Sequence, residues 1–93
     1  MRTIERTSSF RRDFKRVKRG QHRHEIDSLI LDTVKLLSED KNLPEKYRDH
    51  QLSGEWSDFR ECHVKPDLLL IYRKPETGVL QLVRLGSHSE LFG

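Results

Sequence analysis

Residues 59–73 read FRECHVKPDLLLIYR, and this stretch decides the fold. Residues 59–64 alternate in polarity, which predicts a strand with one buried face. The next three residues, 65–67, have the composition of a tight turn. Residues 68–73 are almost continuously apolar, which predicts a central strand buried on both faces. The stretch therefore predicts an antiparallel hairpin in the middle of a sheet.

The segment that follows the hairpin extends the sheet. Residues 76–78 read Glu-Thr-Gly, a turn composition, and residues 79–85 predict a third strand. In the resulting meander we expect the end of the third strand to lie beside the start of the first. The residues after Leu85 are expected to leave the sheet as a tail.

A first helix is predicted after a short strand at residues 2–6. Ser8 or Ser9 can cap this helix by accepting hydrogen bonds from its free backbone amides. Gly20 is expected to end it. The inward face at helical spacing is expected to consist of Phe10, Phe14 and Val17.

The second and main helix is predicted over residues 22–39. Its apolar stripe is expected to pack on the sheet, and it consists of Ile26, Leu29, Ile30, Val34 and Leu37, widened by Leu31 and Leu36. Residues 40–54 predict a polar loop, because Pro44 disfavours helix in the residue before it. The predicted class is α+β, with two N-terminal helices packed on a small twisted, mainly antiparallel β-sheet.

Length and composition limit the class of protein. The 93 residues are expected to form one domain, residues 1–93, with a single core. The one cysteine, Cys62, excludes an internal disulfide and a multi-cysteine zinc site, and it is expected to be a small buried side chain. No apolar stretch is long enough to span a membrane, and the N-terminus lacks the apolar core of a signal peptide. We therefore expect a soluble, cytoplasmic protein with no membrane partner.

The net charge of +3 hides an asymmetry along the chain. Residues 11–24 hold seven Lys or Arg and one Asp, whereas residues 25–58 hold nine acidic and four basic residues. A basic block of this kind is typical of a surface that binds polyanions, and equally of a solvated helix face. The cations of this basic patch are Arg11, Arg12, Lys15, Arg16, Lys18 and Arg19.

Histidine, aspartate and arginine gather in the second half of the chain and suit acid–base chemistry on a phosphodiester at neutral pH. RNA cleavage by the 2′-hydroxyl requires a base, an acid for the leaving 5′-oxygen, and positive charge at the phosphate. The candidate acids and bases are His50, His63, Asp67 and His88. The candidate phosphate- and RNA-binding residues are Arg84, Lys65, Arg60 and Phe92, the last by stacking on a base.

The predicted meander brings these candidates toward one another, since Arg84 and His88 would approach His50 and His63. Structural roles also remain open for several of them: Asp67 is a usual turn residue, Arg84 could pair with Glu61 or Glu90, and Phe92 could pin the C-terminus to the core. Residues given no catalytic role are His22, His24 and Trp56, the last expected to be partly buried packing.

Three motifs resemble the YafQ-type toxins of the RelE/ParE superfamily, small bacterial mRNA interferases of toxin–antitoxin pairs. The motifs are Asp49-His50-Gln51-Leu52 with Gly54 and Trp56, residues 60–67 running into Leu69, Ile71 and Tyr72, and residues 84–88 with Leu91 and Phe92. The resemblance extends over nearly the whole chain in length and element order, whereas the first third matches only in pattern.

The resemblance implies a RelE-like microbial RNase fold and a ribosome-dependent endoribonuclease that cuts mRNA and is held inactive by a cognate antitoxin. It implies that the functional positions are His50, His63, Asp67, His88 and Phe92. Our hypothesis assigns His88 as general acid and His50 or Asp67 as base, with His63 and Arg84 orienting the phosphate. We expect no cofactor and no metal.

Three other functions remain open. The first is a ParE-like gyrase-inhibiting toxin, which would not need this set of histidines. The second is a transition-metal site built from the four candidate acids and bases, although their spacing matches no compact ligand motif. The third is a non-catalytic nucleic-acid-binding module that uses the basic patch.

Overall fold

The hairpin predicted from residues 59–73 lies at the centre of a five-stranded sheet in the computed structural model, which describes residues 1–93. β3 (Arg60–Lys65) and β4 (Leu68–Arg73) pair antiparallel. β5 (Val79–Gly86) pairs antiparallel with the other edge of β4. Five of the six residues of β4 are buried, so the prediction of a central strand covered on both faces is confirmed.

The two edge strands complete the order β1-β5-β4-β3-β2. β1 (Thr3–Arg6) pairs parallel with β5, and β2 (His50–Gln51) pairs antiparallel with β3. The α+β class with a mainly antiparallel sheet is confirmed. The prediction of a loop over residues 40–54 misses β2, because a two-residue strand is too short to show alternation.

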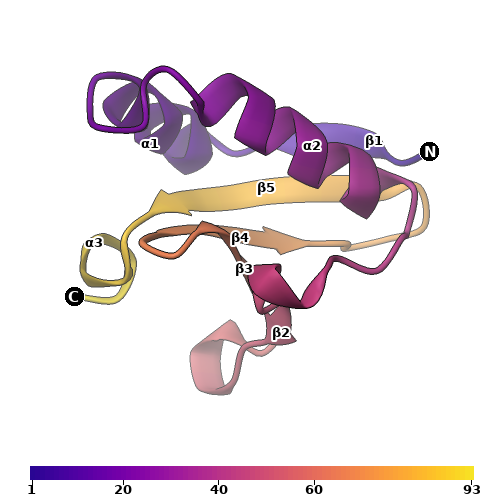
Figure 1. Cartoon of the computed structure of the whole chain (residues 1–93). Helices are drawn as coiled ribbons and strands as arrows, with labels where there is room; N and C mark the ends of the chain where they lie inside the picture. Colours follow the sequence, from indigo (N-terminus) through magenta and orange to yellow (C-terminus); the bar gives the residue numbers. More distant parts are fainter.

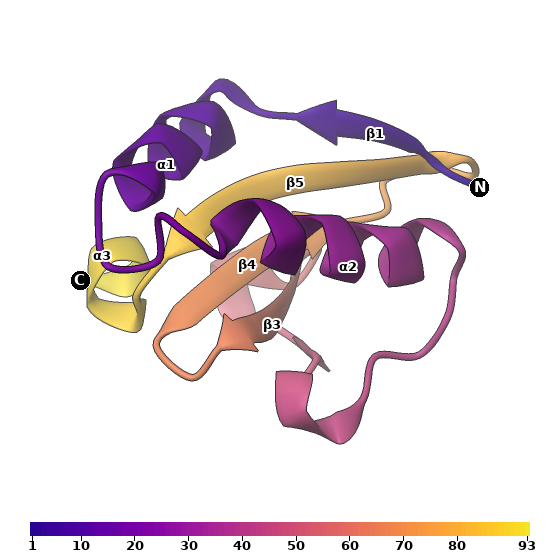
Figure 2. The same ribbon diagram turned by 45° about the horizontal axis from the view of Figure 1, so that its top comes forward.

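Two helices cover one face of the sheet (Figure 1). α1 (Ser8–Lys18) and α2 (Ile26–Ser38) lie on the same side, with the strands running beneath them (Figure 2). Neither these helices nor any other has both the length and the apolarity needed to cross a membrane. The main core lies between helices and sheet and consists of Phe10, Val17, Ile26, Leu37, Cys62, Val64, Leu68, Leu70, Tyr72, Leu80, Leu82 and Leu85.

The starts of both helices differ from the prediction. Thr7, and neither Ser8 nor Ser9, caps α1: its hydroxyl accepts from the amide of Phe10 and donates to a carbonyl of β5. α2 begins four residues later than predicted, because residues 21–25 form a turn. Leu31 is 68% exposed, so it does not widen the buried stripe of α2 as expected.

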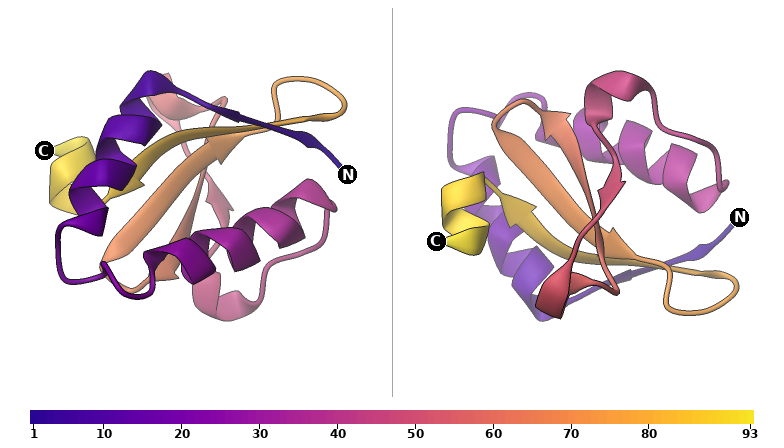
Figure 3. Two further views of the ribbon diagram at one scale, coloured as in Figure 1. Left: turned by 90° about the horizontal axis from the view of Figure 1, so that it is seen from above. Right: turned by 90° about the horizontal axis from the view of Figure 1, so that it is seen from below.

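The opposite face of the sheet carries the C-terminus (Figure 3). A smaller apolar cluster lies on the same face. Two 3₁₀ turns, η1 (Glu45–Tyr47) and η2 (Gly54–Trp56), flank β2 in the chain. Tyr47 of η1 packs against the main core, whereas Trp56 of η2 packs against the smaller cluster. The predicted tail is a short helix instead, α3 (His88–Phe92), because Ser87 and Glu90 form a reciprocal capping box at its start. The cluster consists of Leu69, Ile71 and Leu91, with Leu52, Trp56, Phe59 and Val83 partly buried around it.

We expect Leu70→Ala to lower the free energy of unfolding by about 2–5 kcal/mol, because Leu70 is fully buried and its truncation leaves a cavity. Leu31→Ala removes the same atoms from an exposed site and should change that free energy by less than about 0.5 kcal/mol. Urea unfolding followed by circular dichroism measures both. Equal losses for the two variants would contradict this description of the core.

Candidate active site

Two rows of paired residues organise the sheet face that α1 and α2 leave uncovered. In the first row His50 pairs with Glu61, Glu61 with Ile71, and Ile71 with Arg84. Because Cys62 belongs to the core under the helices, its neighbour Glu61 points to the opposite face. The pairing of β2, β3, β4 and β5 thus sets the order of the row across the sheet: His50, Glu61, Ile71 and Arg84.

The second row begins two residues further along β3 and therefore lies on the same face. There His63 pairs with Leu69, and Leu69 pairs with Gly86. His88 begins α3 two residues after Gly86. His63 and the start of α3 thus share one end of the sheet, separated by two strand spacings, or about 10 Å of backbone.

The expected meeting of strand ends is therefore partly wrong. β3 and β5 both run antiparallel to β4, so the end of β5 lies beside the end of β3 and not beside its start. His88 accordingly lies at the same end of the sheet as His63, and their expected meeting in one site stays a prediction. Arg84 lies three strand spacings from His50, about 14 Å across the sheet, so the backbone does not bring these two together.

Glu61 is a functional candidate that was not predicted from the sequence. Its carboxylate is only 6% exposed and lies between two histidines: Oε2 is 3.9 Å from Nε2 of His50, and Oε1 is 3.5 Å from Nε2 of His63. A buried carboxylate in contact with two imidazoles is a common arrangement for orienting rings and stabilising their protonated forms. Because residues two apart in a strand share one face, the sequence of β3 was enough to indicate that Glu61 lies on the same face as His63.

Backbone carbonyls fix the tautomers of both histidines. Nδ1 of His50 lies 2.7 Å from the carbonyl oxygen of Arg48, and Nδ1 of His63 lies 3.3 Å from that of Pro66. A carbonyl oxygen only accepts, so Nδ1 carries the proton in each ring. In the neutral rings Nε2 is therefore the unprotonated nitrogen, and in both it faces Glu61.

Asp67 is paired with two residues of the turn between α1 and α2. Its carboxylate is 55% exposed, accepts a hydrogen bond of 2.6 Å from Nε2 of Gln21, and lies 3.3 Å from Nε2 of His22. These contacts tie the β3–β4 turn to the turn between α1 and α2. The predicted catalytic role of Asp67 stays a prediction, and its observed partners are structural.

Each predicted phosphate-binding cation pairs with a carboxylate. Arg60 donates to Asp49 at 3.0 Å and Lys65 lies 3.0 Å from Glu25. Arg84 pairs with neither Glu61 nor Glu90 but donates to Asp13 on α1. Their roles toward RNA stay predictions, and their charges are balanced by these carboxylates.

Arg48 is a further cation, two residues before His50. It is exposed, forms no ion pair, and holds the left-handed backbone conformation with φ of 49° at the end of η1. Its carbonyl oxygen is the one that fixes His50. Non-glycine residues in this conformation cluster at functional sites, and this geometry is invisible in the sequence.

A row of aromatic rings lies beside His88 on the same side of the sheet. The ring centroids of His88 and Phe92 are 5.0 Å apart, those of Phe92 and Trp56 are 5.5 Å apart, and those of Trp56 and Phe59 are 5.3 Å apart. Trp56 is partly buried packing, as predicted. Phe92 is 37% exposed, so it both packs on Trp56 and presents a ring to solvent.

Cys62 belongs to the core as expected. It is fully buried, and burial, aided by the charges of Asp49 and Glu61, raises the pKa of its thiol. A protonated thiol is a poor nucleophile. The chain contains no group of three or more His, Cys, Asp or Glu placed to hold a metal ion.

Asp13 is a buried carboxylate on α1 that lies 4% exposed. Burial disfavours its charge, yet hydrogen bonds from Arg84, from the amide of Leu85 and from Arg16 prevail and lower its pKa. A lowered pKa in the folded state contributes stability at neutral pH that is lost as the pH falls through that pKa. The sequence offered no signal for this residue, because Arg84 is 71 positions away.

We expect Asp13→Asn to destabilise the protein most at pH 7 and progressively less as the pH falls below the ordinary aspartate value of 3.8. Urea unfolding of wild type and variant between pH 7 and pH 3 measures this. Asp32→Asn, which removes an exposed carboxylate without an ion pair, is the matched control. A pH-independent difference between wild type and Asp13→Asn would contradict the ionic role.

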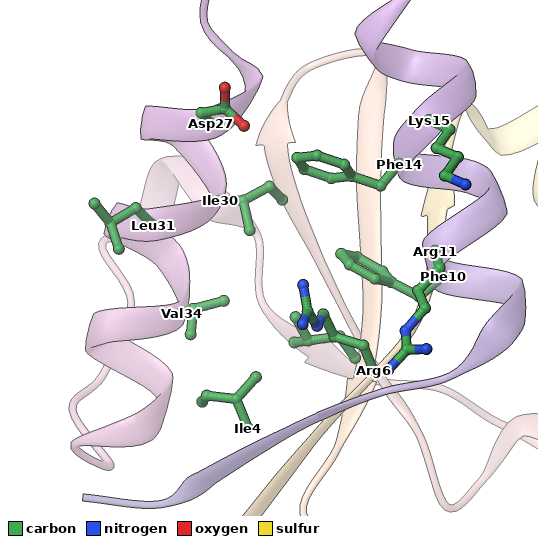
Figure 4. A pocket seen from close by; sticks show the side chains of 11 residues that line it. Ile4, Arg6, Phe10, Arg11, Phe14, Lys15, Asp27, Ile30, Leu31 and Val34 are labelled. Atoms are coloured by element: carbon green, nitrogen blue, oxygen red, sulfur yellow. The ribbon is translucent and has the colours of Figure 1, made fainter.

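A groove of about 640 Å³ lies between α1 and α2, and no histidine lines it (Figure 4). Apolar side chains of both helices, β1 and β5 form its floor. Three cations, Arg6, Arg11 and Lys15, stand along it, together with one carboxylate, Asp27, which pairs with Lys18. Ile4 and Leu31 belong to its lining and are exposed to solvent. The groove is therefore an apolar surface with a mainly basic rim.

Comparison with known proteins identifies the family. Residues 2–93 match the family described as the bacterial toxin of the type II toxin–antitoxin system, YafQ. The mRNA interferase toxin YafQ of Escherichia coli is 37% identical over 93 residues, which cover 99% of this chain and 97% of that protein.

Solved structures agree with this match. The crystal structure of E. coli YafQ superposes with a TM-score of 0.81 at 35% identity and covers 100% of both chains. A copper-bound mutant toxin from Helicobacter pylori gives a TM-score of 0.89 at 38% identity, covering 99% of this chain and 100% of that one. In the E. coli DinJ–YafQ complex, the matched chain gives a TM-score of 0.80 at 36% identity, with 100% of both chains covered. The chain belongs to the YafQ family of bacterial toxins of type II toxin–antitoxin systems.

Proposed function

We propose that this toxin is an endoribonuclease that cuts mRNA on the ribosome by acid–base catalysis without a metal, in the cytoplasm. The relative from E. coli is an mRNA interferase. The observation that carries the proposal here is Glu61, buried between the Nε2 atoms of His50 and His63, with His88 at the same end of the sheet. This arrangement offers the groups that phosphodiester cleavage requires.

His50 is the general base in this mechanism. Its Nδ1 proton is held by the carbonyl of Arg48, so Nε2 is free to take the proton of the 2′-hydroxyl. The resulting positive ring lies near Glu61, which offsets the new charge. His63 shares the same carboxylate and is well placed to contact the phosphate on the side toward α3.

His88 is the general acid that protonates the leaving 5′-oxygen. It lies on the first turn of α3, exposed to solvent, with its ring tilted against that of Phe92. The separation of about 10 Å between the backbone at His63 and at Gly86 leaves room for a phosphodiester between the two side chains. Phe92 stacks on a neighbouring base, a contact worth about 1–3 kcal/mol.

Arg48 supplies positive charge at the phosphate. Negative charge grows on the phosphate oxygens in the transition state, and an uncompensated cation stabilises it best. Arg60, Lys65 and Arg84 are balanced by carboxylates, whereas Arg48 forms no ion pair and precedes His50 by two residues.

The ends of the cut RNA test the chemistry. Attack by the 2′-hydroxyl leaves a 2′,3′-cyclic phosphate and a 5′-hydroxyl, and a single 2′-deoxy nucleotide at the cut position should abolish cleavage there. Activity should persist in a chelator. A 3′-hydroxyl with a 5′-phosphate, or activity restored only by added copper or zinc, would refute this mechanism.

The basic patch on α1 is proposed to dock the toxin on ribosomal RNA. Arg11, Arg12 and Lys15 are exposed and form no ion pairs. We expect their combined replacement by glutamate to weaken ribosome binding and to reduce the slope of log affinity against log salt by about one for each lost phosphate contact. Sedimentation binding across a salt titration measures this. Identical slopes for wild type and variant would refute the role of the patch.

A cognate antitoxin is the second proposed partner, since the E. coli relative forms a complex with DinJ. The groove between α1 and α2 suits an apolar segment with acidic flanks, because its floor is apolar and three of the four charged residues along it are cations. Antitoxin bound there would also cover part of the basic patch, at Arg11 and Lys15.

A further inference from the structure

Arg16 links three elements through a single guanidinium. Its Nη1 donates to Asp13 at 2.9 Å within α1, its Nη2 donates to the carbonyl of Leu85 in β5 at 2.8 Å, and its Nε lies 3.1 Å from Glu90 of α3. A planar guanidinium can satisfy three fixed partners at once, whereas an ammonium cannot match this geometry.

Glu90 divides its two oxygens between Arg16 and the start of α3. Oε1 accepts from the amide of Ser87 at 2.8 Å, while the amide of Glu90 donates to the Ser87 hydroxyl at 3.2 Å. Oε2 faces Arg16. Hydrogen bonding by Ser87 and the charge of Arg16 lower the pKa of Glu90 despite some desolvation. The residue that caps α3 is therefore the same residue that joins it to α1.

Gly86 leaves the space that this contact needs. A Cβ at this position would lie 2.8 Å from Nη2 of Arg16, which is closer than Cβ atoms approach, and a tight 3.1 Å from Oε1 of Glu90. The backbone of Gly86 thus passes directly against the ion pair, two residues before His88.

α3 depends on such anchors because it is only five residues long. A helix of this length is not stable on its own. Its anchors are the capping box, the buried side chain of Leu91, the contact of Phe92 with Trp56, and the Arg16–Glu90 pair. Of these anchors, only the Arg16–Glu90 ion pair connects α3 to α1.

We infer that Arg16 is a positioning residue for His88, holding α3 against β5 through Glu90. This inference rests on the proposed function, and it separates Arg16 from the other cations of the basic patch. Arg16 holds α3 in place, whereas its neighbour Lys15 is exposed and unpaired, so loss of one positive charge at either position should have different consequences.

Steady-state kinetics of mRNA cleavage on ribosomes, with Lys15→Gln as matched control, tests the inference. We expect Arg16→Gln to lower kcat by about 10- to 100-fold with KM unchanged, because small displacements of a catalytic group are this costly. Arg16→Lys keeps the charge but cannot bridge three partners, so it should lose kcat as well. Lys15→Gln should raise KM and keep kcat.

A double-mutant cycle and hydrogen exchange complete the test. Glu90→Gln should act like Arg16→Gln, and the double variant should be no worse than either single one, because both remove the same contact. Exchange of the Leu91 and Gly93 amides, which close α3 onto Ser87 and Ser89, should accelerate in Arg16→Gln but not in Lys15→Gln.

The outcomes separate this inference from the proposed function. Wild-type kcat in Arg16→Gln, a rise in KM shared with Lys15→Gln, or unchanged exchange in α3 would each overturn the role of Arg16. Absence of cleavage by the wild-type protein would overturn the proposed function instead. The exchange measurement would then still decide whether Arg16 holds α3, since it needs no activity.

Discussion

Replacement of His88 by alanine is expected to lower kcat for mRNA cleavage on ribosomes by about 10²- to 10⁴-fold, the usual effect of losing a positioned acid. The side chain is exposed on α3, so folding should be unaffected. The pH–rate profile should lose the limb that reports the general acid. Urea unfolding of His88→Ala should give the same curve as the wild type. Single-turnover cleavage rates across a pH range measure the loss of activity and the lost limb.

His24→Ala is the matched control for this prediction. His24 is an exposed histidine in the turn between α1 and α2, where it contacts Arg23. Its replacement should leave kcat unchanged. If His88→Ala kept both the acidic and the basic limb of the wild-type profile, His88 would not be the acid.

Glu61→Gln is expected to lower kcat by about 10²-fold or more. Removing the carboxylate that orients a catalytic histidine can cost up to about 10⁴-fold even when the geometry is kept. In this chain the glutamine would retain the shape of a buried side chain but not the charge that faces His50 and His63. Initial rates at saturating ribosome concentration, together with the unfolding midpoint, test this prediction.

Glu76→Gln serves as the control, since Glu76 lies exposed in the β4–β5 turn without an ion pair. It should retain the full rate. Full activity of Glu61→Gln would show that the buried carboxylate is only structural, and the base would then have to be sought among other residues.

The hairpin could be predicted from the sequence because its signals are local. β4 is a continuous apolar run because it is buried on both faces, and β3 alternates because only one of its faces belongs to the main core. The same alternation puts the side chains of Glu61 and His63 on one face of β3, so their proximity was also visible in the sequence. Ser87 and Glu90 have the spacing of a capping box, so α3 was also visible in principle.

Other features depend on contacts between distant parts of the chain. Arg84 was expected at a phosphate, but the fold places Asp13 beside it, 71 positions earlier in the sequence. The parallel pairing of β1 with β5 likewise joins the two ends of the chain. The hydrogen bond from Gln21 to Asp67 also joins two turns that are far apart in the sequence. Composition and periodicity carry no information on such pairs.

Cleavage of a defined mRNA on programmed ribosomes, in a chelator and beside the same RNA free in solution, tests the proposed mechanism. We predict a cut only on ribosomes, lost in His88→Ala and strongly reduced in Glu61→Gln. No cut under any condition would contradict the ribonuclease proposal and favour inhibition by binding, as in gyrase-directed toxins. Equal cutting by wild type and His88→Ala would contradict the active site described above.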